Sequence, residues 1–200
     1  EEEIKILAKA PLLFQPQKSW RYSVSMDVLA RIIEIVRGDS LQNILQKEIF
    51  NPLDMHDTAF TVSLENQHKV MASYEYDPIK NNLSELISDP QKIGNYGYPL
   101  HASSYARGGH GLFSTLNDYA IFAKMLHSGK SDHGHQILNA DTLKLISTNF
   151  LEEKYLPIEI ATIGIVKDKN YVNGLEAYGW GLGCRTLLDP SKQHDLGSVG

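Results

Sequence analysis

Several features that would place a protein in a functional class are missing from this chain of 200 residues. Its single cysteine, Cys184, can form no internal disulfide and leaves the redox compartment open. No apolar run reaches the roughly 18 residues that a transmembrane helix needs, so we expect no membrane span. The net charge of −5 and the absence of Lys/Arg runs argue against a nucleic-acid partner.

Motifs for nucleophiles, phosphates and metals are also missing. No serine lies in a Gly-x-Ser-x-Gly sequence, and no serine is followed by a lysine three positions later. The glycine-rich run 108–111 has neither a following lysine nor a strand–loop–helix context, so it predicts no phosphate site. His133 and His135 have a metal-like spacing beside Asp132, but a third ligand is lacking and a solvated loop is the better interpretation. We therefore expect no metal and no other cofactor.

The composition is that of an ordinary globular protein, with 42% hydrophobic and 22% charged residues. The length suits one domain, or one domain with a fragment of another. The sequence starts without a methionine or a signal-peptide pattern and stops in a glycine-punctuated stretch, so we interpret it as the middle of a longer polypeptide. The compartment stays open between bacterial periplasm and cytoplasm.

Helical patterns dominate the first three-quarters of the chain. We expect a short acidic helix in residues 1–9, an amphipathic helix capped by Ser25 and ended by Gly38, and another from Ser40 to a stop at Asn51-Pro52. Two later helices begin at the caps Ser114 or Thr115 and Asn139. The inner face predicted for the helix after Thr115 comprises Leu116, Tyr119, Phe122, Ala123 and Leu126.

Strand patterns begin only near the end of the chain. A strand is predicted within 158–165, and a glycine-rich strand over 178–188. Between about 63 and 104 the pattern is loop-rich, with scattered tyrosines to which we assign no role. Segregated helices and strands favour an α+β protein whose sheet lies mostly outside this chain.

Tyr22 is the first candidate for chemistry. It lies in a polar loop, three residues before Ser25, where the positive end of the helix dipole would favour an anion. A phenol, with an ordinary pKa of about 10, needs such an environment to act as a base near neutral pH. A half-buried tyrosine that only packs and hydrogen-bonds would have the same pattern, and the loop alone does not separate the two interpretations.

Four stretches in order resemble the serine β-lactamase and penicillin-binding protein superfamily, and most closely the serine esterases related to class C β-lactamases. They are the tyrosine motif and helix from Trp20 to Gly38, the segment Ile49–Phe60, the helix start Gly109–Phe122 and the late strand Tyr178–Gly183. One such stretch alone would be weak, but together they cover nearly the whole chain.

The resemblance implies a β-lactamase/transpeptidase-like fold, with a helical lobe in residues 1–150 and the start of an antiparallel sheet in 151–200. It implies a serine acyl-enzyme that cleaves a small ester or amide substrate, with Tyr22 as general base. The Ser-x-x-Lys nucleophile would precede Glu1, and the Lys-Thr-Gly or His-x-Gly strand would follow Gly200. The chain alone is therefore expected to be inactive.

Three positions depart from the family pattern. Val24 stands where β-lactamases of the family carry an asparagine whose amide helps to hold the substrate, and this favours an esterase with Val24 beside its substrate site. Gln17 and Asp54 replace glycines that are common in the family, and an aspartate tolerates such a turn better than most residues. A β-lactamase, a D-amino-acid peptidase and an inactive binding protein of the same fold remain the alternatives.

Overall fold

The computed structural model describes residues 2–72, 74–77, 79–85, 106–156, 158 and 177–192. Its α-helices are α1 (Glu2–Leu7), α2 (Ser25–Arg37), α3 (Leu41–Leu45), α4 (Asn51–Leu53), α5 (Leu116–Ser128) and α6 (Ala140–Ile146). Segment η1 (Gln46–Phe50) is a π-helix. Segments η2 (Leu64–Lys69), η3 (Glu153–Tyr155) and η5 (Pro190–Lys192) are 3₁₀-helices. The strands are β1 (Tyr74–Asp77), β2 (Asn82–Glu85), β3 (Tyr178–Trp180) and β4 (Arg185–Leu187), which form two antiparallel hairpins. The described part is thus α+β, as the sequence predicts.

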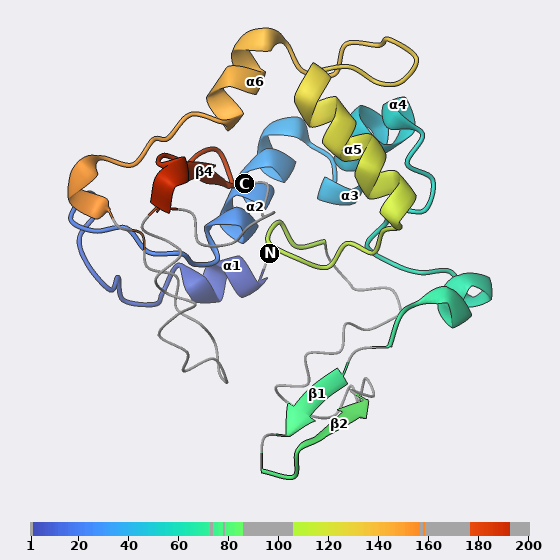
Figure 1. The fold of residues 1–200 in the computed structure, drawn as a ribbon, viewed down its shortest axis with the longest axis horizontal. Helices are drawn as coiled ribbons and strands as arrows, with labels where there is room; N and C mark the ends of the chain where they lie inside the picture. The colour runs from blue at the N-terminus through green and yellow to red at the C-terminus, as the bar shows by residue number, and fades with distance from the viewer. Residues whose placement is uncertain are drawn as a thin grey trace.

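Helix α2 lies at the centre of the molecule, between α1 and β4 on one side and α3 and α5 on the other (Figure 1). The helix begins after Val24, whose backbone oxygen accepts a hydrogen bond of 3.0 Å from the Asp27 N–H. The prediction that Ser25 caps α2 is wrong, because Ser25 is already the first helical residue and the valine before it has no side-chain acceptor. The predicted end is confirmed, since Gly38 has a left-handed φ of 66°.

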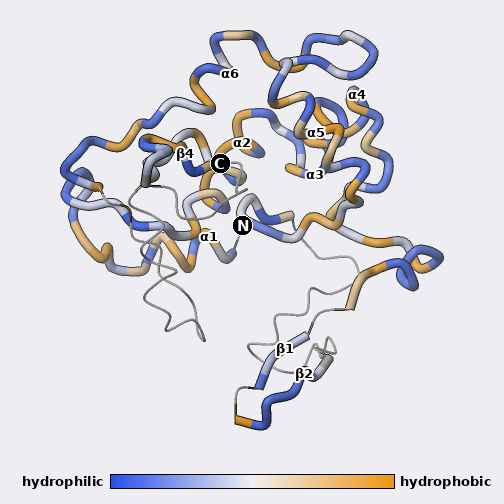
Figure 2. The backbone as a smooth tube through the Cα atoms, viewed as in Figure 1, coloured by the Kyte–Doolittle hydropathy of each residue, from blue (hydrophilic) through white to orange (hydrophobic). Residues whose placement is uncertain are grey.

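The apolar face of α2 is largely exposed. Its buried residues are Asp27 and Ala30, whereas the side chains of Leu29, Ile32, Ile35 and Val36 reach solvent. Figure 2 shows the tube through α2 as hydrophobic along much of its length. A groove of about 380 Å³ runs between α2 and the α3–η1 segment and is lined mostly by isoleucine, leucine and valine side chains.

The helix predicted to run from Ser40 to Asn51-Pro52 is confirmed to within one residue. Segments α3, η1 and α4 follow one another without a break from Leu41 to Leu53, with a π-helical turn in the middle. Pro52 is the last residue but one of this segment, which agrees with the predicted stop at Asn51-Pro52. The segment ends at Asp54, whose left-handed φ of 58° confirms the predicted turn.

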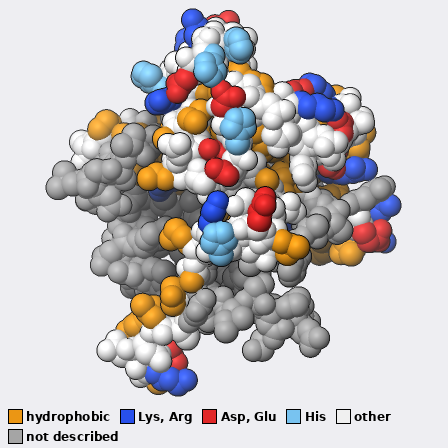
Figure 3. Space-filling model, turned by 90° about the vertical axis from the view of Figure 1, so that its right-hand side faces the viewer, with side chains coloured by type: hydrophobic (Ala, Val, Ile, Leu, Met, Phe, Trp, Pro, Cys, Tyr) orange, Lys and Arg blue, Asp and Glu red, His pale blue; other side chains and the backbone are white. Residues whose placement is uncertain are grey.

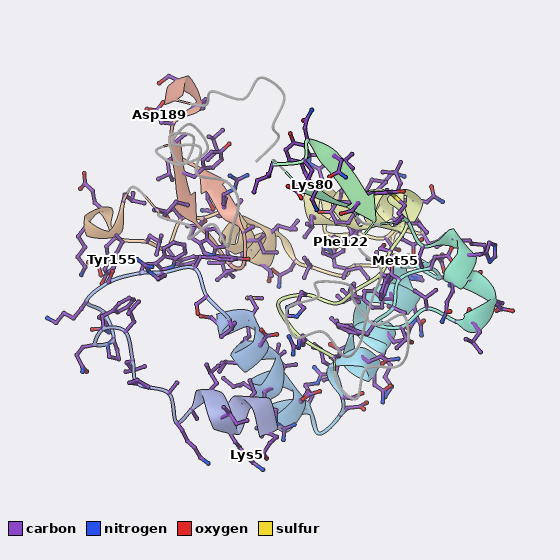
Figure 4. All side chains as sticks on the ribbon, turned by 90° about the horizontal axis from the view of Figure 1, so that it is seen from below. Lys5, Met55, Lys80, Phe122, Tyr155 and Asp189 are labelled. Carbon is purple, nitrogen blue, oxygen red and sulfur yellow. The ribbon has the colours of Figure 1, made fainter. Side chains whose placement is uncertain are left out.

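One core cluster joins this segment to α5. Phe50, Leu53, Met55 and Met125 are buried there, and Figure 4 shows Met55 and Phe122 close together. The predicted inner face of α5 is confirmed for Phe122, which packs against this cluster, but is wrong for Leu116 and Tyr119, which are 89% and 65% exposed. The helix instead turns Asp118 and Met125 inward, because the Asp118 carboxylate accepts hydrogen bonds from Thr58 Oγ1 (2.8 Å) and the Asp57 N–H (2.9 Å). The predicted caps Thr115 and Asn139 are confirmed, each accepting a backbone N–H in its side chain.

Both hairpins differ from the sequence prediction. The pair β1–β2 lies within the stretch expected to be a loop, and Figure 1 shows it apart from the helices. Residues 178–188 form the hairpin β3–β4 in place of one strand, because Gly183 takes a φ of 83° and the Gly181 N–H donates to the Cys184 oxygen. The strand predicted in 158–165 lies outside the described residues except for Ile158, which is buried. No helix in the described ranges is long and apolar enough to cross a membrane.

Candidate active site

Tyr22 lies in the loop that leads from Trp20 to the first turn of α2. Its side chain is 52% exposed. Its ring contacts Trp180 of β3 edge-on, with ring centroids 5.5 Å apart and planes at 65°. One side of the phenol is therefore packed against an indole, while the other is open to solvent.

Trp180 belongs to a second core cluster, which joins the tyrosine loop to the hairpin β3–β4. The rings of Trp180 and Trp20 have centroids 5.3 Å apart. Both tryptophans pack against the buried side chains of Ile158, Ala177 and Tyr178. Farther out, the Tyr155 hydroxyl donates to the Gln17 backbone oxygen at 2.5 Å, which fixes the start of the loop.

A third segment, the glycine loop 106–111, contacts α2 directly behind the tyrosine motif. The Gly109 N–H donates to the Asp27 carboxylate at 3.2 Å. Gly108 lies so close to α2 that a β-carbon there would overlap the Met26 carbonyl oxygen. The contact of this loop with α2 is a finding of the structure.

The turn of β3–β4 also reaches the start of α2. A β-carbon placed on Gly183 would lie 3.7 Å from the Met26 Cε atom, which is an ordinary contact distance. Three segments that are far apart in the chain thus meet at the tyrosine motif and the start of α2. The Trp20–Met26 segment supplies the phenol, and the glycine loop and the β3–β4 turn both contact Met26.

The three departures from the family pattern can now be placed. Val24 is exposed two residues from Tyr22, and its side chain offers no hydrogen-bond donor or acceptor. Gln17 has a left-handed φ of 64°, a conformation that glycine adopts more easily. Asp54 has a φ of 58° in the same region, so both replaced glycines sit at positions that favour glycine.

One histidine of the 131–137 connection, His133, makes a surface contact with Asp54. His133 Nε2 lies 2.7 Å from Asp54 Oδ2, and both side chains are exposed. Figure 3 shows histidines and acidic side chains mixed over this face of the molecule. Among the residues that the structure describes, no three His, Cys, Asp or Glu side chains lie where they could hold a metal ion together.

Sequence reasoning selected Tyr22 but missed Trp180. The motif around Trp180 is visible in the sequence, yet nothing in its spacing shows that its ring meets a loop so distant in the chain. The arrangement provides a phenol whose ring is packed on one side and whose side chain is half exposed. Such a group can exchange a proton with a nucleophile or substrate placed against its open side.

Comparisons with known proteins identify the family of this chain. Residues 1–194 match the family model described as Beta-lactamase. Protein Rv1367c of Mycobacterium tuberculosis is 27% identical over 192 residues, which cover 95% of this chain and 43% of that protein. The lovastatin esterase of Penicillium rubens is 34% identical over 131 residues, covering 62% of this chain and 29% of that protein.

A solved structure shows the same fold. EstCE1, a hydrolase with promiscuous acyltransferase activity, superposes with a TM-score of 0.69 at 22% identity, over 94% of this chain and 46% of its own. The predicted β-lactamase/transpeptidase-like fold is therefore confirmed. The chain spans less than half the length of these relatives. Its match to the family model over nearly every residue shows that the chain belongs to the beta-lactamase family.

Proposed function

We propose that this chain is part of a serine hydrolase that cleaves carboxylic esters through an acyl-enzyme. The serine oxygen attacks the ester carbonyl carbon and passes its proton to the general base, and the alcohol leaves with a proton returned by that base. Water then attacks the acyl-enzyme and releases the acid. Family membership and the similarity to the lovastatin esterase support this reaction class.

We assign the general base to Tyr22. The observation that carries this assignment is the position of its ring, packed on Trp180 on one side and 52% exposed on the other. The nucleophile is expected in a Ser-x-x-Lys motif, which this chain does not contain. We propose that residues 1–150 and 151–200 are the helical lobe and the start of the sheet of one domain, because the relatives are more than twice as long.

The exposed Val24 side chain supports an esterase over a β-lactamase. A valine cannot donate the hydrogen bond that an asparagine amide gives to a β-lactam. We therefore expect the intact protein to hydrolyse p-nitrophenyl butyrate much faster than nitrocefin or a D-alanyl-D-alanine peptide. Preferential turnover of either of the last two would move the assignment to a β-lactamase or a peptidase of the same fold.

The test of the proposed mechanism is Tyr22→Phe in the intact protein, with p-nitrophenyl butyrate as substrate. Loss of a general base predicts a fall in kcat of about 10²- to 10⁴-fold. Tyr119→Phe is the matched control, because Tyr119 is also exposed but contacts Phe122 on α5. Unchanged turnover by Tyr22→Phe would contradict the assigned role.

Labelling with a fluorophosphonate separates the enzyme from an inactive binding protein. We expect intact-mass analysis to show one label on the intact protein and none on the 200-residue chain. A label on the 200-residue chain would place the nucleophile within it and contradict the proposal. No label on either would favour a binding protein of this fold.

A further inference from the structure

The orientation of the Tyr22 ring depends on few contacts of its own. The residue lies in a loop before α2, outside any helix or strand. Within the described ranges its hydroxyl has no hydrogen-bond partner, and the one ring that it contacts is that of Trp180. A tyrosine held only by its backbone could rotate about two side-chain bonds, and a displaced general base loses catalytic efficiency.

The contact with Trp180 has the geometry of a favourable aromatic pair. Centroids 5.5 Å apart and planes at 65° bring the edge of one ring towards the face of the other. Aromatic pairs prefer this edge-to-face arrangement, because the ring edge carries partial positive charge and the face partial negative charge. The indole therefore restricts the phenol without occupying its exposed side.

Trp180 is itself fixed from two directions. Its ring packs on Trp20, and its backbone is held by the side chain of Asn149. Asn149 Oδ1 accepts hydrogen bonds from the N–H groups of Trp180 (3.0 Å) and Leu151 (3.1 Å). The Phe150 N–H donates to the Trp180 oxygen at 2.9 Å, so both polar backbone groups of Trp180 are bound by the 149–151 segment.

We propose that Trp180 is a positioning residue for Tyr22. In this arrangement the 149–151 segment fixes the backbone at the end of β3. The end of the strand presents the indole, and the indole holds the phenol at the angle required for proton transfer. The inference rests on the proposed function of Tyr22 and extends it to a residue from a distant segment. Trp180 acts through Tyr22 and is not expected to touch the substrate.

The test compares Trp180→Leu and Trp180→Phe in the intact protein, with p-nitrophenyl butyrate as substrate. A misplaced base predicts that Trp180→Leu lowers kcat by about ten- to a hundredfold, with KM changed by less than about twofold. Trp180→Phe keeps an aromatic ring and is expected to recover most of kcat. Leu187→Ala, a change in the same cluster, controls for lost packing and should leave kcat unchanged.

A double-mutant cycle decides whether Trp180 acts through Tyr22. We expect Trp180→Leu to lower kcat strongly in the wild-type background and by less than about twofold in the Tyr22→Phe background. An equal fall in both backgrounds would overturn the inference, as would a fall with Leu187→Ala that matches the one with Trp180→Leu.

The experiments can contradict the role of Tyr22 as general base and the role of Trp180 as positioning residue separately. If Tyr22→Phe abolishes turnover but Trp180→Leu has full kcat, the positioning role is wrong and the catalytic assignment stands. If Tyr22→Phe has full kcat, the catalytic assignment is wrong, and the role of Trp180 falls with it. Circular dichroism of each variant establishes that the protein is folded. If Trp180→Leu does not fold, Trp180→Phe still tests the role of the indole, because it keeps an aromatic ring at this position.

Discussion

The carboxylate of Asp27 accepts a hydrogen bond from the backbone N–H of Gly109, a residue 82 positions later in the chain. Asp27 is only 6% exposed and lies in the first turn of α2. The bond therefore joins the helix that follows the tyrosine motif to the glycine loop. It also places a carboxylate at the positive end of the helix dipole, where negative charge is stabilising.

Replacing Asp27 by alanine should destabilise the protein, because the Gly109 N–H loses its partner. We expect a loss of about 1–3 kcal/mol in the free energy of unfolding of the intact protein, measured in urea. Asp141→Ala is the control, since Asp141 also lies in the first turn of a helix but is exposed. Equal losses at the two positions would mean that the helix dipole, and not the bond to Gly109, accounts for the effect.

The neighbouring glycines of this loop should respond differently to alanine. A β-carbon on Gly108 would overlap the Met26 oxygen and lie 2.7 Å from the Ala30 Cβ, so Gly108→Ala must displace the loop or the helix. We expect it to cost about 1–3 kcal/mol of unfolding free energy. On Gly109 the same atom would be 3.4 Å from the Asp27 carboxylate, an ordinary contact, and Gly109→Ala should be tolerated. A larger loss of unfolding free energy in urea for Gly109→Ala than for Gly108→Ala would contradict the close approach of the loop to α2.

Two threonines, one buried and one partly buried, allow a test of how much a hydrogen-bonded hydroxyl contributes to stability. Thr58 Oγ1 donates to the Asp118 carboxylate and lies 2.8 Å from Ser114 Oγ. Thr186 Oγ1 is buried and has no hydrogen-bond partner among the described residues. Because a valine has nearly the same shape, Thr58→Val should lower the unfolding free energy by about 1–3 kcal/mol, whereas Thr186→Val should be neutral or stabilising.

Thermal and urea unfolding of the two valine variants would check this pair. A loss at Thr186 as large as that at Thr58 would show that the Thr186 hydroxyl has a partner in solution. A neutral Thr58→Val would show that the bonds around Asp118 do not hold α5 to the 57–58 segment. Either result would revise the reason given for the inward face of α5.

The sequence predicted those elements whose ends carry local signals. Thr115 starts α5, Asn139 starts α6, and Gly38 ends α2, because side-chain caps and left-handed glycines act within a few residues. The inward face of α5 was mispredicted in part, since Asp118 is drawn in by partners some 60 positions away.

In the candidate site, too, the sequence predicted the local features and missed the contacts between distant segments. Tyr22 could be selected because its motif is continuous in the sequence, and the turns at Gln17 and Asp54 could be suspected from replaced glycines. The contacts of Tyr22 with Trp180 and of Asp27 with Gly109 could not, because each joins distant segments whose meeting depends on the packing of the whole fold.

The carboxyl group of Asp39, just before the cap of α3, should make stability depend on pH in acid. Its hydrogen bond with Lys47 Nζ is the main cause of a lowered pKa, followed by those from Asn43 and the Ser40 N–H, and together they reduce the pKa from 3.8 to about 2. The folded state therefore binds this proton less readily than the unfolded state. The stabilisation is complete above about pH 4 and is lost as the pH falls through about 2.

Asp39→Asn removes this dependence and gives the test. We expect the Tm of the intact protein to fall below that of the wild type at pH 5 to 7, and the difference to shrink as the pH is lowered from about 4 towards 2. Lys47→Met should have a similar but smaller effect, because it removes the largest contribution and leaves the bonds from Asn43 and Ser40. A difference in Tm that stays constant across this range would mean that Asp39 titrates alike in both states, and that the ion pair with Lys47 is not formed in solution.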